Sequence, residues 1–220
     1  MKPILFSTPM VQAILDGRKT QTRRVIKHTG NSMHYGKLLC DWGLSEKPYM
    51  KDGLLYWELQ TAVDDSWVFE IKPKYQPGDI LWVRETWGHI AHPNYNQGGY
   101  DEWFVYKASK QGELPEDFKW RPSIHMPREA ARIFLKVTNI RVEKVQDITE
   151  DDVIAEGMNA GICQNCGKNS YPEPCGCENP QPEYIGAFAY LWNIINKKRG
   201  YGWSKNPWVW VIEFERVEKP

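Results

Sequence analysis

The sequence predicts an α+β fold built around a small β-barrel, and the balance of strand and helix signals carries this prediction. Short branched and aromatic runs bounded by turn residues indicate six or more strands, among them 54–59, 67–71, 80–87, 103–106, 131–145 and 208–214. Helix signals are confined to 8–17, 149–157 and 184–198. Many short strands with few helices favour a sheet that curls around one core.

The first predicted helix covers residues 8–17 and leads directly into a basic segment. Thr8 is the predicted N-cap, Pro9 fills the first helical position and Gly17 is the C-terminal stop. The chain therefore leaves this helix immediately before Lys19.

The other two helices are predicted from a capping motif and from periodicity. Thr149 to Asp152 has the spacing of a capping box, and this helix runs through Ala155 toward Gly157, with Glu156 at its end. Residues 184–198 place four apolar side chains on one face: Phe188, Leu191, Trp192 and Ile195.

The strands are predicted from turns and from alternation. The runs 54–59 and 67–71 flank a polar turn and indicate a hairpin, whereas a Pro-Gly-Asp turn precedes 80–87, which we expect to be a central strand. The apolar period of two in 131–145 breaks near Asn139, which predicts two strands or one bent strand.

Length and charge limit the possible classes of protein. The 220 residues predict a single domain, 1–220, with insertions at about 28–75 and 160–182. The 28 basic and 28 acidic residues balance, so the chain is unlike proteins that bind nucleic acid through a uniformly basic surface. Its start does not resemble a secretory signal, and no apolar run is long enough for a membrane span, so we expect a soluble, cytoplasmic protein without a membrane partner.

The segment after the first helix gathers four cations and two hydroxyls within a few residues: Arg18, Lys19, Thr20, Thr22, Arg23 and Arg24. On an otherwise neutral chain this predicts a local site for an anion or a nucleotide. If the segment is extended, Thr20, Thr22 and Arg24 share one face while Gln21 and Arg23 share the other. A buried lysine can act as a base or activate a threonine. The alternative is a solvated basic turn.

Two further charged residues belong to the second rank of candidates for the same ligand. Arg84 and Glu85 lie on the predicted central strand, where charged side chains point either into a polar pocket or to the outside.

Four cysteines form two close pairs, Cys163 with Cys166 and Cys175 with Cys177, on turns rich in glycine and proline. This spacing predicts a structural zinc ion held by four thiolates, although the spacing does not exclude iron. The alternative is four reduced cysteines in an ordered loop. Cys40 is expected to be a free or core thiol.

The motif Gly17, Lys19, Thr22 and Arg24, placed at a helix end, resembles the signature of the ASCH branch of the PUA-like superfamily. The strand 80–84, the helix ending near Met158 and the closing strand 208–214 follow in the order of that family. The segment 123–127 resembles longer ASCH-like proteins common in phages and prophages. The resemblance implies a PUA-like small β-barrel with flanking short helices and a zinc-knuckle-like insertion.

A small bacterial member of the ASCH family removes the acetyl group from N4-acetylcytidine, and resemblance to it implies catalytic roles for Lys19, Thr22 and Glu156. Thr22 would attack with Lys19 as base, while Glu156 would position the lysine or take a proton. This chain is much longer than that enzyme, so a shared pocket is implied more directly than a shared reaction.

Three functions remain open from the sequence. The leading hypothesis is a protein that binds RNA, a nucleotide or a modified nucleoside through the Lys19 segment. The second is a nucleoside amidohydrolase, and the third is a phage protein-interaction module.

Overall fold

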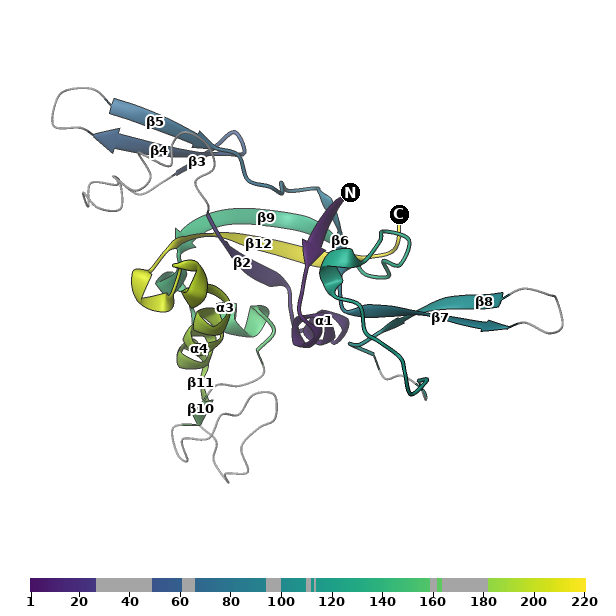
Figure 1. Cartoon of the computed structure of the whole chain (residues 1–220). Coiled ribbons are helices and arrows are strands. Elements are labelled where there is room, and N and C mark those ends of the chain that lie inside the picture. The colour runs from purple at the N-terminus through teal and green to yellow at the C-terminus, as the bar shows by residue number, and fades with distance from the viewer. Residues whose placement is uncertain are drawn as a thin grey trace.

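The computed structural model describes residues 1–26, 49–60, 66–93, 100–109, 112, 114–158, 162–163 and 182–220. Its centre is a five-stranded sheet in the order β1-β6-β9-β12-β2 (Figure 1). These strands are β1 (Lys2–Leu5), β2 (Gln21–Val25), β6 (Ile80–Arg84), β9 (Phe134–Lys144) and β12 (Trp208–Val217). β1 pairs with β6 in parallel, and the other three pairings are antiparallel.

Alternation along β12 divides the apolar core between the two faces of this sheet. Trp210 and Ile212 join the larger cluster, which also contains Leu135 and Ile4 and packs against α1. Val209 and Val211, which point to the opposite face, join a second cluster beneath α4. One strand therefore supports two cores, and β2, its neighbour at the sheet edge, lies between them.

The helices begin and end close to the predicted positions. α1 covers Thr8–Leu15, with Pro9 in its first turn, but its N-cap is Ser7 and not Thr8. α3 covers Glu150–Ala155 and has the predicted capping box between Thr149 and Asp152. Single 3₁₀ turns occur at Ser123–His125, Val145–Asp147, Lys197–Arg199 and Trp203–Lys205.

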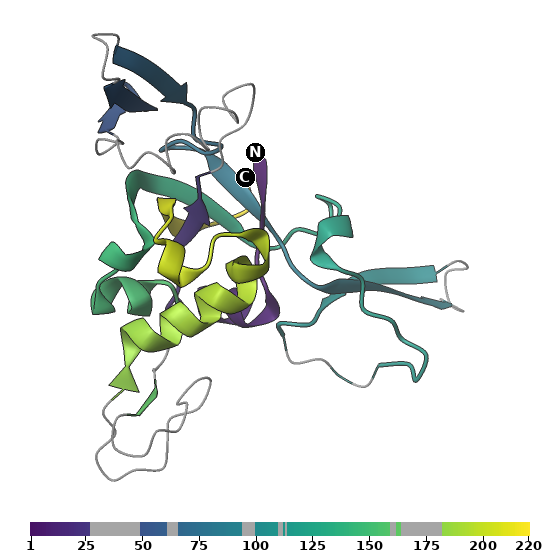
Figure 2. The same cartoon turned by 60° about the vertical axis from the view of Figure 1, so that its left-hand side comes forward.

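α4 (Tyr184–Asn196) lies across one side of the main sheet, with α3 beside it (Figure 2). Phe188 and Trp192 on its predicted apolar face are buried, and Leu191 packs against them. The helical period read from the sequence is therefore confirmed for the part of the face that covers the sheet, whereas Ile195, the last residue of that face, is 39% exposed.

Two predicted strands differ in their bounds. The run 80–87 divides, since β6 ends at Arg84 and β7 begins at Trp87 and pairs with β8 instead. The run 131–145 forms one strand, β9, and the predicted break near Asn139 is a β-bulge in that strand. Glu213 and Phe214 are consecutive on β12, whereas their partners Asn139 and Val137 leave Thr138 as the extra residue of β9.

Three small sheets accompany the main one. The predicted hairpin is β4 (Leu54–Gln60) with β5 (Ser66–Ile71), joined by β3 (Tyr49–Lys51). β7 (Trp87–Pro93) and β8 (Tyr100–Tyr106) form a ribbon that extends away from the main sheet (Figures 1 and 2). β10 (Ile162–Cys163) pairs with β11 (Pro182–Glu183) directly before α4.

The α+β class is therefore confirmed, whereas the predicted closed barrel is not found among the described residues. The main sheet has two edges, β1 and β2, that do not pair with each other there. A side chain links these edges, because the guanidinium of Arg24 on β2 donates to the carbonyl of Leu5 at the end of β1, at 2.8 Å. No helix in the described part of the chain is long and apolar enough to cross a membrane.

Candidate functional site

The turn after α1 is docked onto the end of α3 by its backbone. Gly17 has a φ of +75°, which turns the chain out of the helix, and the Lys19 amide still donates to the Ala13 carbonyl at 3.0 Å. The Thr20 amide then donates to Ala155 at 2.8 Å, and Lys19 forms a backbone bridge with Glu156. The first residues of β2 thus have their position set by a helix far along the chain.

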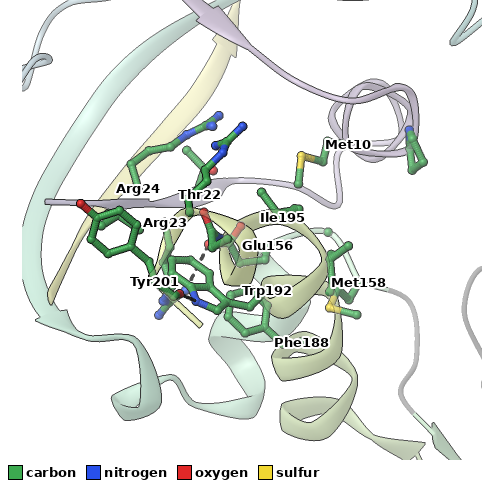
Figure 3. A pocket seen from close by; sticks show the side chains of 16 residues that line it. Met10, Thr22, Arg23, Arg24, Glu156, Met158, Phe188, Trp192, Ile195 and Tyr201 are labelled. Atoms are coloured by element: carbon green, nitrogen blue, oxygen red, sulfur yellow. Dashed lines mark hydrogen bonds and ion pairs between the residues drawn. The ribbon is translucent and has the colours of Figure 1, made fainter. Parts of the chain in front are cut away.

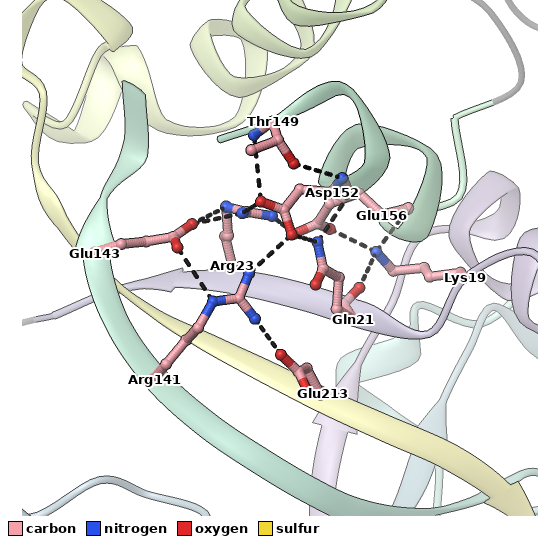
Figure 4. Close-up of polar contacts among 9 residues, drawn as sticks. All are labelled: Lys19, Gln21, Arg23, Arg141, Glu143, Thr149, Asp152, Glu156 and Glu213. Atoms are coloured by element: carbon pink, nitrogen blue, oxygen red, sulfur yellow. Dashed lines mark hydrogen bonds and ion pairs between the residues drawn. The ribbon is translucent and has the colours of Figure 1, made fainter. Parts of the chain in front are cut away.

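The Lys19 ammonium group is completely buried and has three acceptors (Figure 4). It donates to the Gln21 carbonyl at 2.8 Å, to the Glu156 carbonyl at 2.8 Å and to Glu156 Oε2 at 2.7 Å. Burial lowers the pKa of Lys19, and the adjacent Glu156 carboxylate opposes this shift. All three ammonium hydrogens are occupied, so Lys19 holds Glu156 in place.

Gly157 allows this close approach. Its φ is +90°, a conformation that favours glycine, and an added Cβ would lie 2.7 Å from the Ala13 Cβ and 2.8 Å from the Lys19 Cβ. Its carbonyl accepts a hydrogen bond from Arg18 at 2.7 Å. A side chain at this position would push α3 away from the Lys19 turn.

The second buried cation, Arg23, is surrounded by three carboxylates (Figure 4). Its guanidinium lies 2.5 Å from Glu143, 3.0 Å from Asp152 and 3.3 Å from Glu156. Because its side chain is 1% exposed, these partners are what make its burial tolerable. Arg23 therefore joins β2 to β9 and to both ends of α3.

A second arginine extends the same network toward β12. Arg141 pairs with Glu143 at 3.2 Å, with Asp152 at 2.8 Å and with Glu213. Gln21 donates from Nε2 to Asp152 Oδ1 at 2.9 Å. Burial acts to raise the pKa of Asp152, but the hydrogen bonds from Gln21 and the Thr149 amide, with the two arginines, lower it to about 2.

Arg24 differs from its neighbours because no carboxylate in the described residues forms an ion pair with it. It is half-buried, it donates to the Leu5 carbonyl, and its guanidinium lies 5.3 Å from the centre of the Phe6 ring. Burial lowers the pKa of Arg24, Tyr75 and Glu156 oppose this shift, and Arg199 adds to it. Arg24 thus lies within the field of the Glu156 carboxylate but forms no ion pair with a carboxylate in this part of the chain.

A cavity of about 250 Å³ opens beside β2 (Figure 3). Its polar lining comes from Thr22, Arg23, Arg24, Glu156, Asn196 and Arg199. Its apolar and aromatic lining includes Met10, Met158, Phe188, Trp192, Ile195 and Tyr201. Three separate elements, α1, β2 and α4, therefore converge on one space that combines flat apolar walls with hydrogen-bonding groups.

The structure separates the predicted residues of the basic segment. Thr22, Arg23, Arg24 and Glu156 line the cavity. Lys19 does not line it, but its ammonium group is bonded to the Glu156 carboxylate that does. Arg18 pairs with Asp16 at 2.8 Å, and Thr20 is exposed. The predicted division of β2 into two faces is confirmed, because Gln21 and Arg23 meet Asp152 whereas Arg24 meets Phe6.

Arg84 and Glu85 are not part of this cavity lining. Arg84 packs over the Trp82 ring at 5.4 Å and donates to the Ile124 carbonyl. Glu85 is 1% exposed and receives two hydrogen bonds of 2.9 Å from Arg132. This pair, in which Arg132 is partly exposed, lies where the chain leaves β6 for β7, so its contacts hold that corner together.

Sequence reasoning missed several residues of the site. Arg141, Glu143 and Asp152 carry no local signal beyond the capping role of Asp152, since each has a partner on another element. Arg199 and Tyr201 follow α4 in a basic, irregular segment. All four residues of the predicted apolar face of α4 line the cavity, although that face indicated only a core: Phe188, Leu191, Trp192 and Ile195.

Most of the predicted metal site lies outside the described residues. Cys166, Cys175 and Cys177 belong to the undescribed segment, whereas the Cys163 backbone pairs with Pro182 in β10 and β11. Cys40 also lies outside the described ranges. Within those ranges, no group of three His, Cys, Asp or Glu side chains is arranged to hold a metal ion.

Comparisons with protein-family models, with curated proteins and with solved structures found no match.

The depressed pKa of Asp152 predicts a specific loss of stability in acid. Because its folded pKa of about 2 lies below the ordinary value of 3.8, the carboxylate stabilises the fold above about pH 4. That contribution, about 2 kcal/mol, is lost as the pH falls from about 4 to 2. We expect Asp152→Asn to lower the free energy of unfolding at pH 7 by about this amount, measured by urea denaturation with tryptophan fluorescence.

The control for this experiment is Asp151→Asn, an exposed neighbour in the same helix. It should stay within about 0.5 kcal/mol of the parent protein. A stability deficit of Asp152→Asn that stays constant from pH 7 down to pH 2 would show that the network does not depress this pKa.

Proposed function

We propose that this protein binds a nucleotide or a nucleic acid, with one base held in the cavity beside β2. The observation that supports this most directly is the composition of the cavity: aromatic walls face a hydroxyl, a carboxylate and two arginines without carboxylate partners in the described residues. A nucleotide needs this combination, because its base has an apolar face and a polar edge and its phosphate is an anion.

The roles of the lining groups follow from their chemistry. The aromatic rings of Phe188, Trp192 and Tyr201 offer apolar surface against which a base can pack. The Glu156 carboxylate can accept a hydrogen bond from an exocyclic amino group, as carboxylates do with cytosine. Arg24 and Arg199 can meet phosphate. The cavity therefore favours a ligand of base size that carries an anionic group.

The ion-pair network supports this proposal by fixing the polar side of the cavity. Glu156 is held by Lys19 at 2.7 Å and by Arg23 at 3.3 Å, so its carboxylate cannot turn away from the lining. A positioned acceptor loses less entropy on binding than a mobile one. The ASCH-like assignment, with its PUA-like barrel, belongs to the same proposal and is supported by the position of Lys19 and Thr22 after α1.

The first test is binding by the four ribonucleosides, their 5′-monophosphates and N4-acetylcytidine, measured by calorimetry. We expect at least one of them to bind, and Tyr201→Ala to weaken its affinity about tenfold, since stacking on an aromatic ring contributes roughly 1–3 kcal/mol. The backbone of Tyr201 keeps its bonds to Asn196 and Trp192 in this variant.

The matched control is Tyr190→Ala, because Tyr190 is 62% exposed on α4 and does not line the cavity. It should bind the ligand as the parent protein does. Absence of binding by every compound in the panel and by single-stranded RNA would refute the proposed function.

A second candidate function is hydrolysis of an acylated base, and it is favoured by the placement of Thr22 and Glu156 in one lining. The Thr22 hydroxyl would attack the acetyl carbon of N4-acetylcytidine and pass its proton to Glu156. The amide C–N bond would then break, with that proton going to the departing N4 amino group. Water would cleave the acetyl-threonine ester and release acetate.

In this scheme Lys19 acts through Glu156, as a positioning residue. Its Nζ already donates to three acceptors, whereas Glu156 lines the cavity. The structure thus favours Glu156 over Lys19 as the group that receives the threonine proton, which modifies the hypothesis drawn from the sequence.

Release of acetate from N4-acetylcytidine tests this second function. If it operates, Thr22→Val should lower the rate by at least a hundredfold, because the nucleophile is lost while the shape of the side chain is kept. Thr20→Val is the control, since Thr20 is exposed and lies outside the cavity lining. Equal rates in the two variants, or no acetate from the parent protein, would leave binding as the function.

We also propose a structural zinc ion held by Cys163, Cys166, Cys175 and Cys177. In support, β10 and β11 bring the two ends of the segment 164–181 together directly before α4, whose residues line the cavity. The purified protein should contain about one zinc per chain, and Cys166→Ser with Cys175→Ser should remove it, as measured by plasma emission spectrometry. Cys40→Ser is the control, and an unchanged zinc content in the double variant would contradict the assignment.

A further inference from the structure

A second cavity of about 430 Å³ lies on the other side of Arg24, in the opening between the sheet edges β1 and β2. The sheet lines it with Leu5, Ile140 and Trp210, and the segment after β5 contributes Lys72, Lys74 and Tyr75. Arg24 and Val25 line both this cavity and the first one. The two spaces are therefore neighbours separated by a single stretch of β2.

Four cations around the two cavities share a lack of carboxylate partners among the described residues. Lys72 and Lys74 are exposed, and no carboxylate forms an ion pair with either of them within the part of the chain that the structure describes. Arg24, which is half-buried, and Arg199, which is exposed, likewise form no ion pair with a carboxylate of the described residues. On a chain with no net charge, these four residues form a positive strip, without carboxylate ion pairs among the described residues, from the first cavity to the second.

Arg24 lies at the centre of this strip, and an anionic ligand would compensate its charge more than that of the other three cations. A half-buried guanidinium loses hydration, and its observed partners are one carbonyl oxygen and one aromatic ring. Lys19 and Arg23, by contrast, are fully matched by carboxylates from α3 and β9. A phosphate at Arg24 would supply the missing negative charge between the two cavities.

We propose that the ligand is a single-stranded polynucleotide that occupies both cavities, with one base in each and the phosphate between them on Arg24. This inference rests on the proposed function, because the first cavity must take a base. The second cavity has the lining that such a neighbour requires: apolar and aromatic surface from Tyr75, Trp210 and Ile140, with Lys72 and Lys74 positioned for the next phosphate.

A strand explains more of the surface than a free nucleotide does. A mononucleotide in the first cavity engages Arg24 and Arg199 but leaves the second cavity and its lysines without a role. A duplex cannot enter, because both cavities require the faces and edges of unpaired bases. Single strands are recognised elsewhere by this combination of a positive groove and base-sized apolar surfaces.

The test compares a labelled single-stranded RNA dodecamer of mixed sequence, its duplex and the four nucleoside 5′-monophosphates. We expect the single strand to bind at least tenfold more tightly than any mononucleotide and than the duplex. Lys72→Gln with Lys74→Gln should weaken dodecamer binding about tenfold and make its salt dependence less steep by roughly 1.4 in log–log slope. Mononucleotide affinity should change less than twofold.

The control double variant is Lys107→Gln with Lys119→Gln, which removes the same charge from exposed positions outside both cavities. A dodecamer that binds no more tightly than a mononucleotide, or equal binding by the two double variants, overturns the second cavity's role and leaves the proposed function intact. Absence of binding by both mononucleotides and dodecamer overturns the proposed function as well. Tyr201→Ala, which alters only the first cavity, should weaken both kinds of ligand.

Discussion

The buried pair of Lys19 and Glu156 sets the geometry on which the site depends. It joins the turn after α1 to the end of α3, and Gly157 lets the two backbones approach closely enough for the ammonium group to reach three acceptors. Two charges removed from water are tolerated only when each is fully partnered. The pair therefore fixes the position at which β2 begins relative to the position at which α3 ends. Residues from both of these segments line the cavity.

Around this pair the protein separates its cations into two groups. Lys19, Arg23 and Arg141 are enclosed by carboxylates from α3, β9 and β12, and they hold the elements together. Arg24, one residue beyond Arg23, faces the opposite side of β2 and has no such carboxylate among the described residues. Because side chains alternate between the two faces of a strand, consecutive arginines of β2 have different roles: Arg23 stabilises the fold, and Arg24 is available to bind a ligand.

The position of β2 at the edge of the sheet explains why a site forms there. An interior strand is covered on both sides by neighbours, whereas the outer side of an edge strand is open to ligands. Here α4 covers one face near β2 and creates the first cavity, and the unpaired opening toward β1 creates the second. The Arg24 side chain bridges that opening by its hydrogen bond to the Leu5 carbonyl. A ligand phosphate at Arg24 would therefore also stabilise the junction between the two edges.

The sequence by itself determined the local features: the glycine stop after α1, the capping box of α3, the apolar face of α4, the alternation in β9 and β12, and the concentration of charge after Gly17. These follow from capping, periodicity and turn chemistry, which act over a few residues. Tertiary structure alone decided which cations are neutralised, because Lys19 and Glu156 lie 137 positions apart, and it decided that Arg199 and Tyr201 join the cavity. It also decided that Glu85 pairs with Arg132 at a corner of the fold, and that the ladders of the described strands leave the sheet open between β1 and β2. Contacts of this kind depend on where distant segments meet, which no local pattern specifies.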